Sequence, residues 1–372
     1  MAKLGMPNPQ IAFQEAGVEA IERSQRGIVA LLLEEPSTTI EKVGSLVRLY
    51  DVGDIPADLT DANKDYIIKT FKGYVTSPRR VIIALQAQTA DEGTDADKFE
   101  PTLKTLETER WDWLAIPTIK SEQCEYVASW MKTQRENKHK RSKVVLPGYA
   151  ADHEGVVNFS NTKIIVGEKT YTPAEYTPRI AGIICGTPMK IAATYAPVNE
   201  ITDCDRHTID ENDEKVNKGE FFIWYDGEKF KMSRAVNSLV TTTEGKLEKY
   251  QTIKTMETMD MIHDDIWKTT QDSYTGKYAN DPDNKKLLIT AILGYLAQLE
   301  NERLLEKGKS FVDIDVEGVK AYVLSKGRYT KEQLSGMTED EIKRLDTDKK
   351  VFLRGKINIL DAMEDINLTF DI

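Results

Sequence analysis

Four short runs of consecutive apolar residues mark the first 150 positions of the chain. They lie at 27–33, 81–85, 113–116 and 144–146. Runs of this length are typical of strands that are buried on both faces. Amphipathic helical patterns separate these runs, at 64–74, 99–110 and 121–136, the last with Ser121 as a suitable N-cap. Strands that alternate with helices predict an α/β layer, in which helices cover both faces of a sheet.

The middle of the chain has the pattern of antiparallel strands. Residues 164–171 indicate a short hairpin. Residues 221–232 indicate a stronger one, because Asp226-Gly227 suits the positive φ angles of a type I′ turn between alternating residues. The segment 178–186 is small and apolar and is expected to pack closely. Residues 204–214 are expected to form a polar, acidic loop.

Two long helices are predicted in the last third. Apolar residues recur on one face of 252–276, and Gly276 is placed to end this helix. The apolar stripe is expected to be core and consists of Ile253, Met256, Met259, Ile262, Ile266, Trp267 and Tyr274. A second helix is expected over about 284–306. The residues from Thr338 to Glu341 form a capping box that opens a short charged helix, and 351–359 returns to a strand.

These patterns together predict a mixed α/β (α+β) fold. We expect a layered α/β core and a C-terminal domain with two long helices and a mixed sheet. The expected parts are an N-terminal arm over 1–22, an α/β domain with β-hairpins over 23–245, a C-terminal core domain over 246–362 and a C-terminal arm over 363–372.

Both ends of the chain have an extended pattern. Residues 366–372 alternate between apolar and polar side chains, and the prolines near the start favour extended structure over 7–13. An alternating strand buries one face only when it is paired, and its backbone can pair with another chain. The pattern therefore leaves two possibilities, pairing within the same subunit or strand addition to a neighbouring subunit.

Composition excludes several classes of protein. The chain has 50 Lys and Arg against 61 Asp and Glu, a formal net charge of −11, and 40% hydrophobic residues, as is typical of a globular protein. An acidic surface repels phosphate backbones and anionic lipid, so we expect no direct contact with nucleic acid and no membrane insertion. No signal peptide is evident, and the longest clean apolar run, 28–33, is far shorter than the roughly 20 residues of a membrane span.

No motif for a catalytic, cofactor or metal site is found. The nucleotide-binding glycine motifs, the H-E-x-x-H zinc motif and the G-x-S-x-G nucleophile motif are absent. The four histidines lie apart from one another, and the three cysteines include no C-x-x-C pair, so they are interpreted as buried thiols. The basic stretch from Lys132 to Lys143 contains no aromatic residue that could stack on bases and is interpreted as the solvated end of a helix. We therefore predict no catalytic residues, no cofactor and no bound metal.

Several segments, in the expected order, resemble contractile tail sheath proteins of phages and phage-tail-like bacteriocins. They are 26–30 (RGIVA), 180–188 with 193–195, 261–280 (MIHDDIWKTTQDSYTGKYAN), 293–296 and 361–368 (DAMEDINL). The resemblance covers most of the chain and consists of loose motifs. Because the chain is short, it is similar to a near-minimal sheath protein without inserted outer domains.

The resemblance implies a structural role with no enzymatic activity. Subunits of this family stack in rings, usually sixfold, around an inner tail tube and contract to drive the tube through a target cell envelope. The implied partners are other copies of the chain, the tube protein, and the baseplate and tail terminator proteins. The implied location is a virion tail or tail-like particle that is assembled in the bacterial host cytoplasm.

The resemblance also assigns roles to residues at the termini and to one helix. Arms that add strands to neighbouring subunits would contain Asn8, Gln10, Ile11, Phe13, Ile366, Leu368, Phe370 and Ile372. Sheaths of this family hold the tube through a short helix, for which Lys343 and Arg344 are candidates, although an ordinary solvated helix explains them equally well. Two other functions remain open, a soluble α/β enzyme with an unrecognised active site and another self-assembling capsid or tube component.

Overall fold

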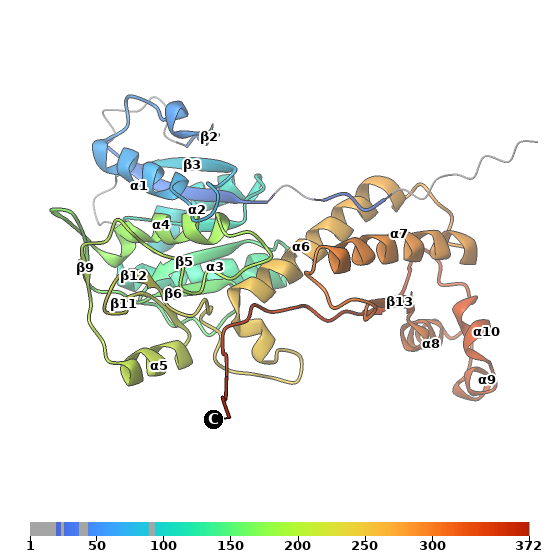
Figure 1. The fold of residues 1–372 in the computed structure, drawn as a ribbon. Coiled ribbons are helices and arrows are strands. Elements are labelled where there is room, and N and C mark those ends of the chain that lie inside the picture. The colour runs from blue at the N-terminus through green and yellow to red at the C-terminus, as the bar shows by residue number, and fades with distance from the viewer. Residues whose placement is uncertain (1–19, 24–25, 37–43, 89–93, 372) are drawn as a thin grey trace, which may run out of the picture. The chain divides into compact units, whose positions relative to one another are not determined.

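The computed structural model describes residues 20–23, 26–36, 44–88 and 94–371. These residues form two compact units. The α/β unit lies within 24–264 and 359–371, and the C-terminal unit lies within 20–23 and 265–358. Figure 1 labels the elements of both units.

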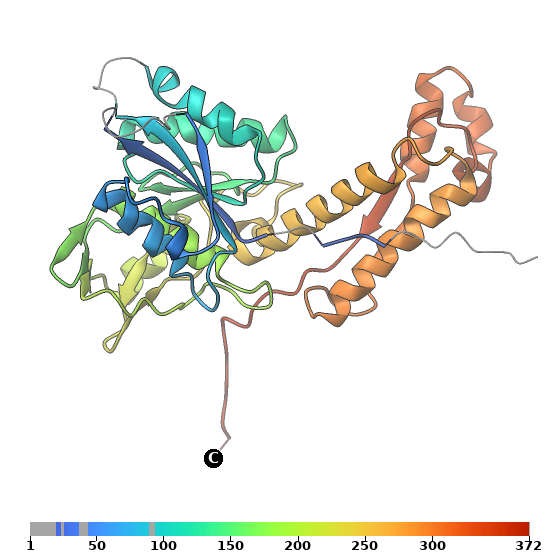
Figure 2. The same cartoon turned by 90° about the horizontal axis from the view of Figure 1, so that it is seen from above.

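A seven-stranded sheet forms the centre of the α/β unit (Figures 1 and 2). Its order is β10-β6-β5-β4-β1-β3-β2, and every neighbouring pair is parallel except β2 with β3. The strands are β1 (Ile28–Glu35), β2 (Leu46–Leu49), β3 (Arg80–Ala87), β4 (Trp113–Ala115), β5 (Lys143–Pro147), β6 (Val156–Phe159) and β10 (Glu220–Phe221). The four apolar runs of the sequence are β1, β3, β4 and β5, which lie side by side, and this prediction is confirmed.

Helices cover both faces of this sheet, as predicted. α1 (Asp61–Phe71) and α4 (Pro173–Cys185) pack on one face, and α2 (Asp95–Glu107) and α3 (Cys124–Glu136) on the other. Side chains of β1 alternate between the two cores, with Leu31 in the first and Leu32 in the second. α1 and α4 approach so closely that a Cβ atom at Gly182 would lie 2.2 Å from the carbonyl oxygen of Thr70.

Smaller elements complete the α/β unit. They are β7 (Ile164–Val166), β8 (Lys169–Tyr171), β9 (Asp203–Cys204), β11 (Ile223–Tyr225), β12 (Phe230–Met232), α5 (Ile209–Asn217) and the 3₁₀ turns η1 (Val52–Asp54), η2 (Ser121–Gln123) and η3 (Glu248–Gln251). The pairs β7–β8 and β11–β12 are the two hairpins expected from the sequence.

The C-terminal unit begins within α6 (Ile253–Thr269), which continues into the π-helical turn η4 (Thr270–Tyr274). Its further elements are α7 (Pro282–Asn301), β13 (Phe311–Ile314), α8 (Val316–Ser325), α9 (Lys331–Ser335), α10 (Glu339–Lys343) and β14 (Leu353–Lys356). α8, α9 and α10 lie near one another in both views (Figures 1 and 2). The capping box of Thr338 and Glu341 opens α10, as predicted. The mixed α and β fold class is therefore confirmed.

Several local predictions are wrong. Lys120, rather than Ser121, is the N-cap of the turn that leads into α3. The β11–β12 hairpin has a four-residue loop, in which the Asp226 carboxylate accepts the N–H groups of Glu228 and Lys229 at 2.9 Å, and only Gly227 has a positive φ. The turn is therefore not type I′, because its side-chain hydrogen bonds favour a longer loop.

Other corrections concern whole segments. Residues 178–185 belong to a helix, α4, which packs closely as expected, whereas 209–217 form a second helix, α5, within what was expected to be a loop over 204–214. Trp267 is 57% exposed within α6 although its position predicted core. In the described part of the C-terminal unit, β13 and β14 form a purely antiparallel pair, where a mixed sheet was expected. α7 ends at Asn301, earlier than predicted.

Candidate functional site

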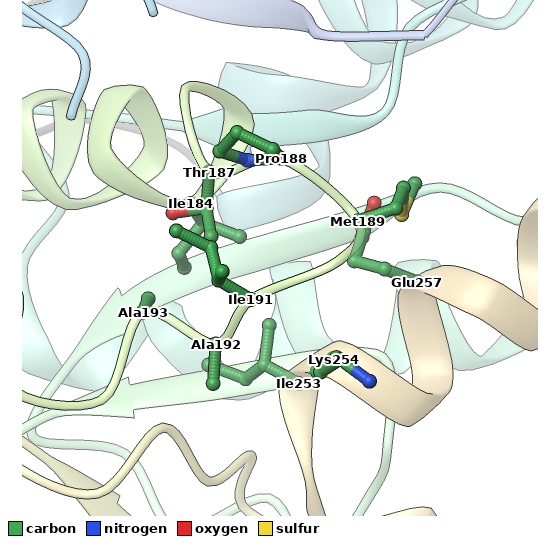
Figure 3. A pocket seen from close by; sticks show the side chains of 10 residues that line it. All are labelled: Ile184, Thr187, Pro188, Met189, Ile191, Ala192, Ala193, Ile253, Lys254 and Glu257. Atoms are coloured by element: carbon green, nitrogen blue, oxygen red, sulfur yellow. The ribbon is translucent and has the colours of Figure 1, made fainter. Parts of the chain in front are cut away.

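A small, shallow pocket of about 20 Å³ lies between α4, the loop that follows it and α6 (Figure 3). Its lining is mostly apolar, with Lys254 and Glu257 as its titratable groups. Both have partners, because Glu257 pairs with Lys143 at 2.8 Å and Lys254 donates a hydrogen bond to the carbonyl oxygen of Leu360. The pocket therefore presents no convergent pair of titratable side chains for acid–base chemistry.

The described residues contain neither a metal-binding cluster nor a helix suited to span a membrane. No group of histidine, cysteine and carboxylate side chains in this part of the chain is arranged to hold a metal ion. None of the helices that the structure describes combines the length and the apolar character that a membrane span requires.

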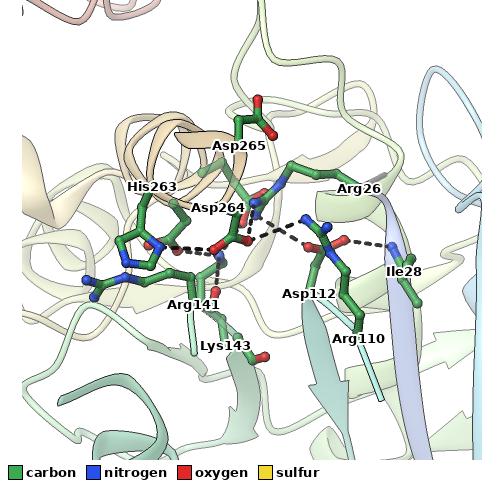
Figure 4. Close-up of polar contacts among 12 residues, drawn as sticks. Arg26, Ile28, Arg110, Asp112, Arg141, Lys143, His263, Asp264 and Asp265 are labelled. Atoms are coloured by element: carbon green, nitrogen blue, oxygen red, sulfur yellow. Dashed lines mark hydrogen bonds and ion pairs between the residues drawn. The ribbon is translucent and has the colours of Figure 1, made fainter. Parts of the chain in front are cut away.

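A buried set of charges attaches α6 to the α/β unit (Figure 4). We call this set the α6 anchor; its carboxylates are Asp112, Glu257, Asp260 and Asp264, and its cations are Arg26, Arg110, Arg135 and Lys143. The Asp260 carboxylate accepts two hydrogen bonds from Arg135 at 3.0 Å and one from Lys143 at 2.6 Å. Since four carboxylates face four cations, the desolvation of each charge is offset by an opposite charge.

Other residues of the α6 anchor lie at the starts of strands in the central sheet. Arg26 precedes β1 and lies 3.3 Å from both Glu257 and Asp264, and Asp112, just before β4, accepts the N–H groups of Gly27 and Ile28 at 2.7 and 2.9 Å. Trp113 donates its indole N–H to Glu257 at 3.0 Å. The starts of neighbouring parallel strands therefore converge on one face of α6.

The charges in the anchor shift one another's pKa values. Burial opposes ionisation of Asp260, but Lys143 and Arg135 outweigh this effect and hold its pKa well below the usual range. Glu257 has a lowered pKa for the same reasons, with Lys143 and Arg26 outweighing burial. The pKa of Arg26 is raised, because Asp112 and Glu257 outweigh the cost of burying its charge. Asp260, Glu257 and Arg26 are therefore ionised at neutral pH.

Asp265, the residue after Asp264 on α6, contacts side chains of the C-terminal unit instead. The Asp265 carboxylate accepts the hydroxyl hydrogen bond of Tyr295 on α7 at 2.6 Å and lies 3.9 Å from Arg23. Burial and this carboxylate raise the pKa of Tyr295 well above its usual range. Adjacent carboxylates on one continuous helix therefore hold different units, so that α6 links the two.

The C-terminal segment returns to the α/β unit after β14. Ile359 is buried, and Glu364 bonds to Thr194 and Arg234. The predicted arm residues Ile366, Leu368 and Phe370 then lie on the surface, where they are 79%, 71% and 78% exposed. Residues 361–371 form no strand, and the chain extends away from the unit toward its end (Figures 1 and 2). Three large apolar side chains are thus presented to solvent at alternating positions.

The remaining predicted site residues are spread over the chain. Asn8, Gln10, Ile11, Phe13 and Ile372 lie outside the described residues. Lys343 ends α10 and pairs with Asp313 of β13 at 2.7 Å, and Arg344 is the exposed C-cap of that helix. Both candidates for the tube contact therefore lie at the C-terminal end of α10.

The α6 anchor was not evident from the sequence, and two of its cations were misinterpreted. Arg135 and Lys143 were assigned to a solvated helix end, but both side chains are almost fully buried against Asp260. The available signal was the spacing of Glu257, Asp260 and Asp264, which places three carboxylates on one face of an otherwise core-facing helix. A row of this kind needs buried cations from elsewhere in the chain.

Comparison with known proteins gives a consistent result. The phage tail sheath protein central domain matches residues 92–238, and the phage tail sheath C-terminal domain matches residues 246–372. The tail sheath protein of Clostridium phage phiCD119 is 33% identical over 369 residues, which cover 98% of both chains.

Two solved structures have a similar fold. The anti-feeding prophage (AFP) helical sheath in its contracted state has a TM-score of 0.71 at 17% identity, and the AFP baseplate, 6-fold symmetrised, has a TM-score of 0.66 at 16% identity. Each alignment covers 99% of both chains. From the two matching domains and the relative that aligns along almost its whole length, the chain belongs to the phage tail sheath family and is a structural subunit of a tail sheath.

Proposed function

We propose that the chain polymerises as stacked sixfold helical rings around an inner tail tube, and that the sheath contracts to drive the tube through a target cell envelope. The observation that carries this proposal is the alignment over 98% of a tail sheath protein, together with a fold similar to a sheath solved in its contracted state. The similar baseplate structure with 6-fold symmetry supports the ring order and a baseplate partner. The subunit itself hydrolyses no nucleotide in this mechanism, because the energy is stored in its interfaces.

The C-terminal arm is the proposed link between subunits. Ile366, Leu368 and Phe370 lie on one face of an extended chain, and burying each on a neighbour would contribute about 1.5–3 kcal/mol. We propose residues 8–13 as the corresponding N-terminal arm. We also propose that the C-terminal core domain begins at 246 and the C-terminal arm at 363. The matched family domain begins at 246 as well.

The β13–β14 pair is the proposed acceptor for such arms. In the described residues each of these strands pairs only with the other, so both outer edges are open to a further strand. A two-stranded sheet is marginal alone and gains stability when strands are added. Backbone pairing also suits a joint that survives rearrangement, because it does not depend on one side-chain geometry.

Removal of residues 366–372 tests the proposal. We expect the shortened chain to keep the thermal unfolding midpoint of the full chain, since the side chains of 366–371 are exposed, but to remain dispersed where the full chain forms tubes. Negative-stain electron microscopy and sedimentation provide the measurement. The combined variant Asn367→Ser and Thr369→Ser, on the opposite face of the arm, is the matched control and should form tubes. Tubes of normal diameter from the shortened chain would contradict the proposal.

A further inference from the structure

We propose that Thr194 and Arg234 form a clasp on Glu364 and Asp365 that fixes where the C-terminal arm leaves the subunit and so limits its reach. The inference rests on the proposed role of residues 366–372 as an inter-subunit arm. It assigns a positioning role to two residues of the α/β unit that lie far from the arm in sequence.

The clasp is built from short polar contacts. The Thr194 hydroxyl donates to a Glu364 carboxylate oxygen at 2.6 Å and accepts the backbone N–H of Ala235 at 2.9 Å. The Arg234 guanidinium lies 3.3 Å from Glu364 and 2.5 Å from Asp365. Glu364 is thus held by both residues and Asp365 by Arg234, and the Thr194 hydroxyl is in turn bonded to the backbone of Ala235, the residue after Arg234.

The corner that presents Thr194 is conformationally unusual. Tyr195 has a φ of +57°, a value that non-glycine residues rarely adopt. Its ring packs 5.9 Å from that of Trp224, and Lys231 lies 4.9 Å from the ring centre. Strained residues of this kind persist where the surrounding structure holds them, and they concentrate at functional positions.

A second set of contacts holds the chain before the clasp. Ile359 is buried, and its carbonyl oxygen accepts a hydrogen bond from Lys249 at 3.4 Å. Lys254, at the pocket shown in Figure 3, donates to the carbonyl oxygen of Leu360. Residues 359–365 are therefore attached at both ends of the segment.

Beyond the clasp the described side chains are all exposed, whereas before it exposure alternates, with Met363 93% exposed and Glu364 partly buried. The Glu364 side chain is 18% exposed, whereas the Asp365 side chain is 75% exposed and the apolar residues beyond it are all exposed. The free arm thus begins at Ile366, directly after the clasp.

The clasp determines the reach of the arm. Seven residues, 366–372, span at most about 24 Å when fully extended, whereas release of the segment back to Asp361 would give twelve residues and about 41 Å. A longer tether lowers the effective concentration of the arm at one acceptor, here by about twofold, and brings other acceptors within range. The clasp therefore favours pairing with one particular neighbour, and its loss should affect the regularity of tubes more than their formation.

Spin labels on the dispersed full-length subunit test the clasp directly. A nitroxide on Met363→Cys reports the clasped segment, and one on Leu368→Cys reports the arm; the labelled chain without an added cysteine gives the background of the three native thiols. We expect slow motion at 363 and fast motion at 368. Thr194→Val with Arg234→Ala should make position 363 as mobile as 368. Arg206→Ala, which removes an exposed arginine that pairs with Asp203 at 3.0 Å, is the matched control and should change neither spectrum.

The same variants are then examined as tubes by electron microscopy. We expect the clasp variant to give tubes of irregular diameter, whereas Arg234→Lys, which keeps a cation beside both carboxylates, should retain both slow motion at 363 and regular tubes. Fast motion at 363 in the unmodified subunit, or regular tubes from the clasp variant, would overturn the clasp. Normal tubes after removal of 366–372 would instead overturn the arm itself and leave the mobility at 363 unaffected, so the two failures are distinguishable.

Discussion

Asp260 is the residue on which the attachment of α6 depends most. It bonds to both Arg135 and Lys143, and its side chain is 3% exposed. Asp260→Asn would remove the carboxylate that pairs with buried Arg135 and would leave buried Lys143 with Glu257 alone, and breaking a buried pair costs about 3–5 kcal/mol. We expect the free energy of unfolding to fall by that amount in denaturant titration. Asp264→Asn, at a partly exposed position of the same helix, is the control and should cost no more than about 1 kcal/mol. Equal losses for both variants would contradict this account.

His153 gives the protein a specific dependence on pH. Burial lowers its pKa from 6.5 to about 4, with Glu154 offsetting part of the shift, and its Nδ1 accepts the N–H of Gly155 at 2.9 Å. The unfolded chain takes up a proton near pH 6.5, but the folded chain does so only near pH 4. The contribution of His153 to the free energy of unfolding is therefore fully present above about pH 6.5. It decreases as the pH falls toward 4, by at most about 3 kcal/mol.

Thermal unfolding midpoints measured between pH 7 and 4.5 test this dependence. His153→Gln keeps an acceptor near the Gly155 N–H but does not titrate, so its midpoint should decrease less over this range. His207→Gln changes an exposed histidine and is the control. The same pH dependence in His153→Gln and in the unmodified chain would show that another group is responsible.

Individual charged residues were the hardest to place from sequence. The stretch from Lys132 to Lys143 has the composition of a solvated segment, and local composition does not show that Arg135 and Lys143 face α6 more than 100 positions later. Such pairing depends on tertiary structure, because a buried cation is tolerated only beside its partner. The alternation at 366, 368 and 370 was evident, since it needs only local sequence, but the strand that it predicts is not formed in the described residues 361–371.

At the scale of elements, α10 provides the test of the tube contact. Lys343→Glu would place a carboxylate beside Asp313 and weaken the C-terminal unit, so Arg344→Glu alone is the cleaner change. If α10 holds the tube, co-expression with the tube protein should give fewer extended particles by electron microscopy. Lys331→Glu, an equal change of charge on α9, is the control. A normal share of extended particles from Arg344→Glu would leave α10 as an ordinary solvated helix.

Strands were more predictable than the helices of the middle region. Continuous apolar runs identified β1, β3, β4 and β5 because both faces of these strands are covered. α4 was missed because it contains Pro178 and Gly182, which disfavour helices, yet the capping box of Thr172 and Glu175 starts it and Gly182 permits close contact with α1. α5 has its own capping box, Thr208 with Glu211, which its acidic composition obscured.

At the scale of the whole molecule, the order of elements and family motifs was sufficient to indicate a sheath subunit. The division into compact units was less accessible, because the boundary at 264–265 falls inside one continuous helix, α6. The helical spacing of apolar residues along the sequence continues through this boundary without interruption. The change of partners from Asp264 to Asp265 marks it only in three dimensions.

The net charge of −11 acts on the assembly as a whole, since like-charged subunits repel when they stack. Apolar burial and backbone pairing are two kinds of contact that can offset this repulsion. The exposed alternating residues of the C-terminal arm and the open edges of β13 and β14 can form such contacts. The proposed assembly therefore depends on one contact, the pairing of the C-terminal arm with another copy of the chain.

Cryo-electron microscopy of the full-length chain, expressed alone and concentrated, tests that contact most directly. We predict striated hollow tubes with a helical lattice, in which residues 366–370 form a strand on the sheet of a neighbouring subunit. Discrete particles at every concentration, or tubes in which 366–370 fold back onto their own subunit, would contradict this prediction.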